Sequence, residues 1–219
     1  MESEQRPDLH RRWPGFRAVF DSDPQGGAWY LHLLNLSQRP TESVRVVAEC
    51  VRTATSPAGE IDALWQELDW RFHLVGAVGF LALSDRGGLV ESLWRRIEQG
   101  SWVAPQLCAC AALADPGFVR RASLLIESST SRDRVEPPEL LVARPPWATD
   151  GDPSWEPHTI VLFDLLKTVA ALAALLDYPL TDEQAALIAK DHDAGSIATD
   201  WTARIQHGFA ETGTPVHHP

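Results

Sequence analysis

A short proline-rich stretch in the second half of the chain holds the densest group of side chains suited to binding. Trp147 and Trp155 offer a large contact area with few rotatable bonds, which is typical of interface anchors. Asp150, Asp152 and Glu156 surround them with negative charge. We therefore predict that these five residues contact a partner. The alternative is that the two tryptophans pack the stretch back onto neighbouring helices.

Two acidic motifs have the residue types of a metal site but not its geometry. Asp191-His192-Asp193 places two carboxylates beside an imidazole, yet adjacent residues on a helix do not converge on one point. A calcium loop that begins at Asp150 would need glycine and glutamate at its sixth and twelfth positions, where Trp155 and Val161 stand. We expect neither a metal nor another cofactor, and we interpret the first motif as a solvated helix end.

A second candidate contact surface lies near Trp70. Asp69 and His73 flank this tryptophan on an expected helix, and both could line a groove between helices. A lone histidine on such a helix is more often a packed or surface residue. His73 and Asp69 are therefore predicted partner contacts with a structural alternative.

Sequence signatures of catalysis are missing. The chain has no glycine-rich phosphate loop, dinucleotide fingerprint, serine elbow or zinc-type spacing. Cys50, Cys108 and Cys110 lie in apolar helical segments without an evident histidine partner, so we interpret them as small buried residues in a reducing compartment. We predict no catalytic residue, although an active site assembled from distant residues would leave no local motif.

The elements that position these residues show an internal repeat. Trp70 and Trp102 each open an apolar helical pattern, and each pattern breaks at a turn before a second amphipathic segment begins. The turns are Asp85 to Gly88 and Asp115 to Gly117. A helix-turn-helix unit that recurs at this spacing indicates stacked helical hairpins. Together with a preceding pair, the region 40–127 is predicted to form three helix pairs.

The remaining segments define the expected domain organisation. Residues 1–22 are predicted to be an irregular N-terminal arm, and residues 23–207 a single helical-repeat domain. A proline-rich loop at 128–156 interrupts this domain, and residues 208–219 are predicted to be a flexible tail. Since no segment alternates convincingly between apolar and polar residues, the predicted fold is all-α.

The paired helices resemble the HEAT-type α-solenoids, in which antiparallel helix pairs stack into a curved array. The resemblance covers residues 40–127 and extends over 157–207. It departs in the shorter repeat, because HEAT units have about forty residues, and in the proline-rich interruption. The resemblance implies a concave binding surface and by itself implies no activity.

The charge of the chain restricts the classes of partner. The net charge is −11, of which −3 comes from residues 1–110 (14 acidic, 11 basic) and −8 from residues 111–219 (16 acidic, 8 basic). Nucleic-acid binding depends on neutralising phosphates, so this balance argues against it. An acidic half suits a basic protein partner, although the charge also serves solubility. No signal peptide and no membrane-length apolar run of about 18–20 residues is evident, so we expect a cytoplasmic protein and no membrane partner.

These features favour a non-enzymatic protein-binding module, either an adaptor or an inhibitor of the immunity type that covers a basic partner. The alternative from another class is an enzyme that uses a helical-repeat groove, such as a protein similar to the HEAT-like DNA glycosylases. That alternative requires a cationic surface, which the net charge disfavours. A third interpretation is a homodimer formed through the apolar segment 158–176.

Overall fold

The computed structural model describes residues 13–36, 39–129, 157–191 and 193–213. All regular elements among these residues are helices, and one isolated bridge joins Ser22 to Ala28. The predicted all-α class is confirmed. Among the described residues, no helix combines the length and apolar character that crossing a membrane requires.

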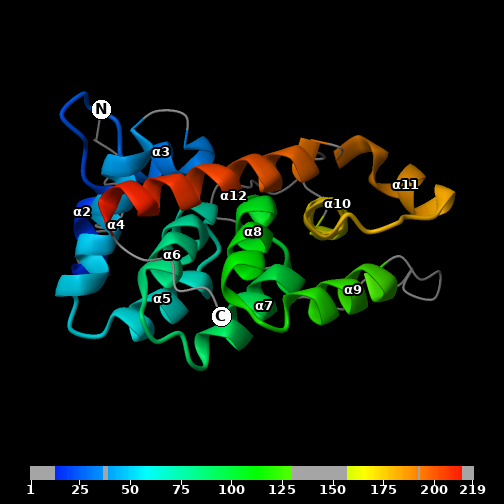
Figure 1. Cartoon of the computed structure of the whole chain (residues 1–219), viewed down its shortest axis with the longest axis horizontal. Helices are drawn as coiled ribbons and strands as arrows, with labels where there is room; N and C mark the ends of the chain where they lie inside the picture. Colours follow the sequence, from blue (N-terminus) through cyan, green and yellow to red (C-terminus); the bar gives the residue numbers. More distant parts are fainter. Residues whose placement is uncertain (1–12, 37–38, 130–156, 192, 214–219) are drawn as a thin grey trace.

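The helices follow the chain in a simple order (Figure 1). They are η1 (Pro14–Phe16), α2 (Arg17–Phe20), α3 (Trp29–Asn35), α4 (Pro40–Thr53), α5 (Pro57–Trp65), α6 (Trp70–Ala82), α7 (Leu89–Gln99), α8 (Ala104–Ala114), α9 (Phe118–Ser129), α10 (Pro157–Leu176), α11 (Asp182–Ile188), η3 (Ala189–Asp191) and α12 (Asp193–Thr212).

Local sequence signals account for several helix starts. Pro57 occupies the first turn of α5, where its missing N–H leaves no donor unsatisfied. The Asp69 side chain accepts a hydrogen bond from the Arg71 N–H and so caps α6. Thr181 and Gln184 form a capping box at the start of α11. The six helices expected between residues 40 and 127 are all present.

Alternate helices pack side by side in two rows. In the first row α4 packs against α6, α6 against α8, and α8 against α10. In the second row α5 packs against α7, and the rows meet where α5 contacts α6 and α7 contacts α8. Figure 1 shows α12 crossing the molecule above these helices, and it packs against α4, α8 and α10. A stack in which each unit touches only its neighbours would lack the contact between α12 and α4.

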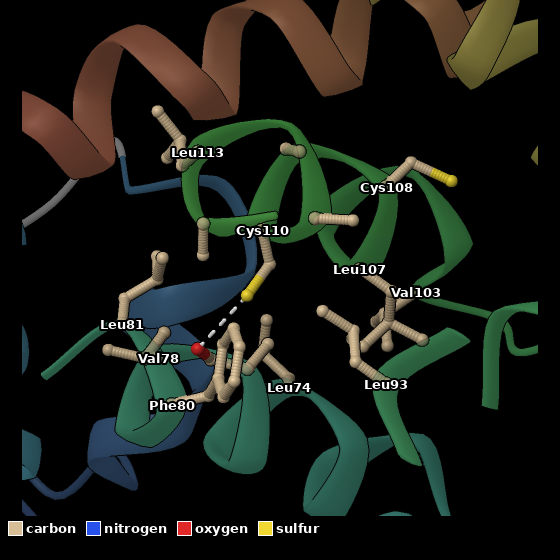
Figure 2. Packing of buried hydrophobic residues seen from close by; sticks show 14 of the residues in the cluster. Leu74, Val78, Phe80, Leu81, Leu93, Val103, Leu107, Cys108, Cys110 and Leu113 are labelled. Atoms are coloured by element: carbon tan, nitrogen blue, oxygen red, sulfur yellow. Dashed lines mark hydrogen bonds between the residues drawn. The ribbon is translucent and has the colours of Figure 1, made fainter. Parts of the chain in front are cut away.

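The centre of the core lies between α6 and α8, which are apolar on nearly every face. Figure 2 shows Leu74, Val78 and Phe80 of α6 facing side chains from α8. The thiol of Cys110 donates to the Ala77 carbonyl, with 3.4 Å between sulfur and oxygen. Burial raises the pKa of the thiols of Cys108 and Cys110 far above its ordinary value, so both stay protonated and unreactive.

The predicted irregular arm is wrong for its last residues. Residues 14–20 form η1 and α2. Three of their side chains and that of the preceding tryptophan belong to the core: Trp13, Phe16, Val19 and Phe20. The apolar pattern of this segment is too short to show a reliable helical periodicity, and Pro14 makes the segment resemble an irregular one. Docking against α4 and α3, rather than intrinsic propensity, supports these two turns.

The predicted tail is wrong for residues 208–212, because α12 continues to Thr212. Gly208, which suggested a helix end, is instead a point of close approach. A Cβ atom there would lie 3.1 Å from Cγ2 of Val44 on α4. The neighbouring Phe209 is fully buried. The absence of a side chain thus allows α12 to pack onto α4.

Candidate functional site

The five predicted contacts in the proline-rich stretch, Trp147, Asp150, Asp152, Trp155 and Glu156, lie outside the described residues. Their predicted role stays a prediction. The described residues place the other two candidates, His73 and Asp69, near each other at the start of α6.

His73 lies in the interior and not on a partner-facing surface, with an exposed fraction of 3%. Its Nε2 lies 2.7 Å from the Glu67 carbonyl oxygen, which can only accept, so Nε2 carries the proton. Nδ1 therefore accepts from the Ser101 hydroxyl at 2.8 Å. The predicted partner contact of His73 is wrong, because burial and these two hydrogen bonds leave no ring nitrogen for a partner.

The Ser101–His73 pair has the hydrogen bond of a nucleophile and its base, but its surroundings do not suit catalysis. Ser101 is only 4% exposed, which prevents access of a substrate. Burial, and then the positive charge of Arg96, lower the pKa of His73 to about 4, which makes it a poor proton acceptor. The arrangement is structural.

Two surface cavities adjoin other parts of the described fold. One, of about 130 Å³, lies between α5 and α7 and includes Asp62, Arg95 and Arg96 in its lining. The other, of about 520 Å³, lies where α4 meets the ends of α6 and α12. Neither is lined by His73 or Ser101. Among the described residues, no three His, Cys, Asp or Glu side chains converge as a metal site would require.

Asp69 keeps a surface position and is tied to Arg71. Both of its carboxylate oxygens accept from Nη1 of Arg71, at 3.0 and 2.8 Å. The Arg71 Nε also donates to the Tyr30 hydroxyl at 3.3 Å. Burial alone would lower the pKa of Arg71, but Tyr30 and Asp69 together raise it, so the guanidinium remains charged.

These contacts belong to a partly exposed group of rings and cations that we call the aromatic cluster: Tyr30, Trp70, Arg71, Trp102 and Lys167. The ring centroids of Trp70 and Trp102 lie 4.9 Å apart, and those of Tyr30 and Trp70 lie 6.2 Å apart. The Arg71 guanidinium lies 4.9 Å from the Trp70 centroid, and the Lys167 ammonium lies 5.9 Å from the Trp102 centroid. Trp102 is 53% exposed, which is unusual for a side chain of this size.

The aromatic cluster is anchored in the core through further rings. Phe20 lies 6.0 Å from Tyr30 and 5.4 Å from Phe72, and both phenylalanines are buried. Each such pair contributes about 0.5–1.5 kcal/mol beyond its buried area. The exposed indole of Trp102 is therefore the outer end of a rigid series of rings.

His73 positions the aromatic cluster from below. It joins the carbonyl of Glu67, three residues before Trp70, to the hydroxyl of Ser101, directly before Trp102. Ser101 Oγ also accepts from the Val103 N–H at 3.3 Å, which shapes the turn before α8. The two turns that carry the tryptophans are thus held together by one buried imidazole.

A carboxylate–imidazole pair near α3 is the other polar group with possible chemistry. Asp23 accepts from Nε2 of His32 at 2.8 Å and from the backbone N–H groups of Gln25 and Gly27 at 2.8 and 2.9 Å. The hydrogen bond from His32 and then those of the backbone hold the pKa of Asp23 below its usual value, against the effect of burial. Asp23 is thus the centre of a tight loop that precedes α3, which begins at Trp29.

Comparisons with known proteins add no relative: the chain matches no family model, no curated protein and no solved structure.

Sequence reasoning found part of this site. It singled out Trp70 and Trp102 as equivalent positions of two repeats, and equivalent positions of stacked helices lie side by side. It did not assign them a site, it counted Arg71 only as a possible groove residue beside Asp69 and His73, and it gave no role to Tyr30 or Lys167. Those residues come from α3, the first turn of α6, and α10, which only the tertiary packing brings together.

Proposed function

We propose that this chain is a non-enzymatic protein-binding module, an adaptor or an inhibitor of the immunity type, that binds a basic protein partner through the aromatic cluster. The observation that carries the proposal is the 53% exposure of Trp102 while its ring is held against Trp70. A large apolar surface that is fixed before binding loses little conformational entropy when a partner covers it.

The composition of the aromatic cluster supports the proposal. Tryptophan, tyrosine and arginine are the residues that dominate the binding energy of protein interfaces. Here Tyr30, Trp70 and Trp102 supply the rings, and Arg71 supplies a guanidinium fixed by Asp69. Leu68, two residues before Trp70, is 68% exposed and extends the apolar character of this region.

The arrangement of helices also supports a binding scaffold. The packing of α4, α6, α8 and α10 side by side supports a helical scaffold that presents surface at its turns. In the proposed scaffold α12 covers part of the first row, so the contact surface lies at the turns before α6 and α8 rather than in an open groove.

The basic character of the partner is supported by charge. The whole chain carries −11, and described acidic residues of the C-terminal half such as Asp177, Asp182 and Asp200 are exposed. Such a field attracts a positively charged protein and speeds its association. The proposal includes a cytoplasmic location, supported by the free state of the three buried cysteines.

Affinity capture from a lysate of the source organism tests the proposal. The immobilised wild type is compared with Trp102→Ser and with Leu187→Ser, a control that removes a similarly exposed apolar side chain (46%) from α11. We expect a basic protein that the wild type and Leu187→Ser retain and Trp102→Ser loses. The proposal would be contradicted by a captured protein that the wild type and both variants retain equally, or by the capture of no protein at low or high salt.

A further inference from the structure

The open part of the aromatic cluster is the ring of Trp102. Trp70 is half-buried, with Trp102, Tyr30 and the Arg71 guanidinium all near its ring. Tyr30 is half-buried as well and has Arg71 5.8 Å from its centroid. A partner side chain that packs on the cluster therefore meets the indole of Trp102 first.

The two cations of the aromatic cluster, Arg71 and Lys167, differ in whether a carboxylate neutralises them. Arg71 is neutralised by both carboxylate oxygens of Asp69. Lys167 makes a cation–π contact with Trp102 but has no carboxylate partner among the residues that the structure describes. Counted over the side chains that the structure describes, the aromatic cluster and Asp69 together carry a charge of about +1, while the whole chain carries −11.

A cationic side chain is a poor fit for this position. The ring faces of Trp70 and Trp102 are already close to Arg71 and Lys167. The Lys167 ammonium, which has no carboxylate partner among the described side chains, would repel a third cation. An apolar group on Trp102 with a carboxylate near Lys167 satisfies both features. The ammonium lies 5.9 Å from the ring centroid, a separation that side chains of adjacent residues, whose Cα atoms are about 3.8 Å apart, can span.

We propose that the aromatic cluster recognises a short protein segment in which an apolar side chain, seated on Trp102, is followed or preceded by Asp or Glu, which pairs with Lys167. This inference rests on the proposed binding function and specifies the partner's anchor. The partner's overall positive charge favours the encounter with an acidic chain, and the local carboxylate selects the segment that docks.

Titration with blocked peptides tests the inference. The probes are acetyl-Gly-Leu-Asp-Gly-amide and the same peptide with Asn, with Lys, or with Ser in place of Leu. Binding is followed through the indole N–H resonances of the ¹⁵N-labelled protein at millimolar peptide. An exposed ion pair is worth about 0.2–1 kcal/mol, so the Asp peptide should bind about 1.4- to fivefold more tightly than the Asn peptide.

Variants of Lys167 and Trp102 test which residue causes the preference for Asp and which the preference for Leu. Lys167→Gln should bind the Asp and Asn peptides equally while it still prefers Leu to Ser, and Trp102→Ser should bind none of them. Arg120→Gln, which removes an exposed cation from α9, should behave as the wild type. Equal binding of the Asp and Asn peptides by the wild type, a preference for Lys, or no resonance shift would overturn the inference. If a captured partner still depends on Trp102 in that case, the proposed function stands and only the anchor chemistry fails.

Discussion

At the residue scale, the molecule separates polar side chains that hold the fold from those that face outward. His73 and Trp102 are near one another in space, yet the first is 3% exposed and the second 53%. Substitution of each should therefore affect different properties. His73 should control stability, and Trp102 should control binding.

The free energy of unfolding should decrease as the pH is lowered, because of His73. The unfolded chain binds a proton at this histidine below about pH 6.5, whereas burial delays protonation of the folded chain to a pKa of about 4. Stability is therefore lost as the pH falls between these values, by about 3 kcal/mol in total. Urea unfolding at a series of pH values measures the loss.

His73→Gln is the matched control, since its amide can still donate to Glu67 and accept from Ser101 but does not titrate. It should flatten the curve between pH 6.5 and 4. Asp23 has a lowered pKa and removes stability mainly below about pH 3.8, and the exposed Glu49 and Glu91 do so mainly below about pH 4.5, so the upper part of the window reports on His73. An equally steep curve for His73→Gln would show that another group causes the loss.

Trp102→Ala should leave the fold nearly as stable as the wild type. The exposed indole loses its ring contact with Trp70, worth about 0.5–1.5 kcal/mol. Trp201 provides the contrast, because its ring is fully buried and its Nε1 donates to the Leu33 carbonyl at 2.8 Å. Trp201→Ala should cost about 3–5 kcal/mol or prevent folding. Thermal unfolding compares them, and a loss above 3 kcal/mol for Trp102→Ala would mean that its role is structural.

At the element scale, α12 packs across α4, α8 and α10, and Gly195 allows its close approach to α10. A Cβ at Gly195 would lie 2.8 Å from Cβ of Ala174 and 3.4 Å from the Ala170 carbonyl oxygen. Gly195→Ala should therefore destabilise the protein by about 1–3 kcal/mol, despite the better helix propensity of alanine. Chemical denaturation with a two-state fit gives the difference.

Gly59→Ala serves as the control, because it makes the same change at an exposed position of helix α5. There the nearest atom is the hydroxyl oxygen of Ser56, which can rotate away. This variant should be as stable as the wild type or slightly more stable. Equal stabilisation by both substitutions would mean that α12 is not closely packed on α10 at Gly195.

The elements also show what the sequence could and could not predict. Helices with sustained periodicity, such as those that begin at Trp70 and at Pro157, were predicted at nearly their observed bounds. The short turns at 14–20 and the last turn of α12 were missed, because long-range burial of Phe16 and Phe209 stabilises them. Part of the aromatic cluster could be found from the sequence, because the internal repeat identifies Trp70 and Trp102 as equivalent positions. The contact of Lys167 with Trp102 could not, because it depends on how α10 packs.

At the scale of the whole molecule, the charge of −11 should govern how fast a basic partner associates. Asp177 and Asp200 are exposed, and asparagine suits the left-handed backbone of Asp177 (φ 49°). The double variant Asp177→Asn/Asp200→Asn should lower the association rate a few-fold at low salt, with little change in dissociation. Stopped-flow mixing measures both, and an unchanged association rate would remove the argument from charge.

The most direct measurement is the Kd of the purified captured partner for the wild type, Trp102→Ala and Leu187→Ala, by calorimetry at one salt concentration. Truncation of an anchor residue at an interface costs about 2 kcal/mol or more, so Trp102→Ala should raise Kd at least about thirtyfold while Leu187→Ala leaves it unchanged. Equal Kd values for all three, with the folded state of each verified by circular dichroism, would contradict a binding site at the aromatic cluster.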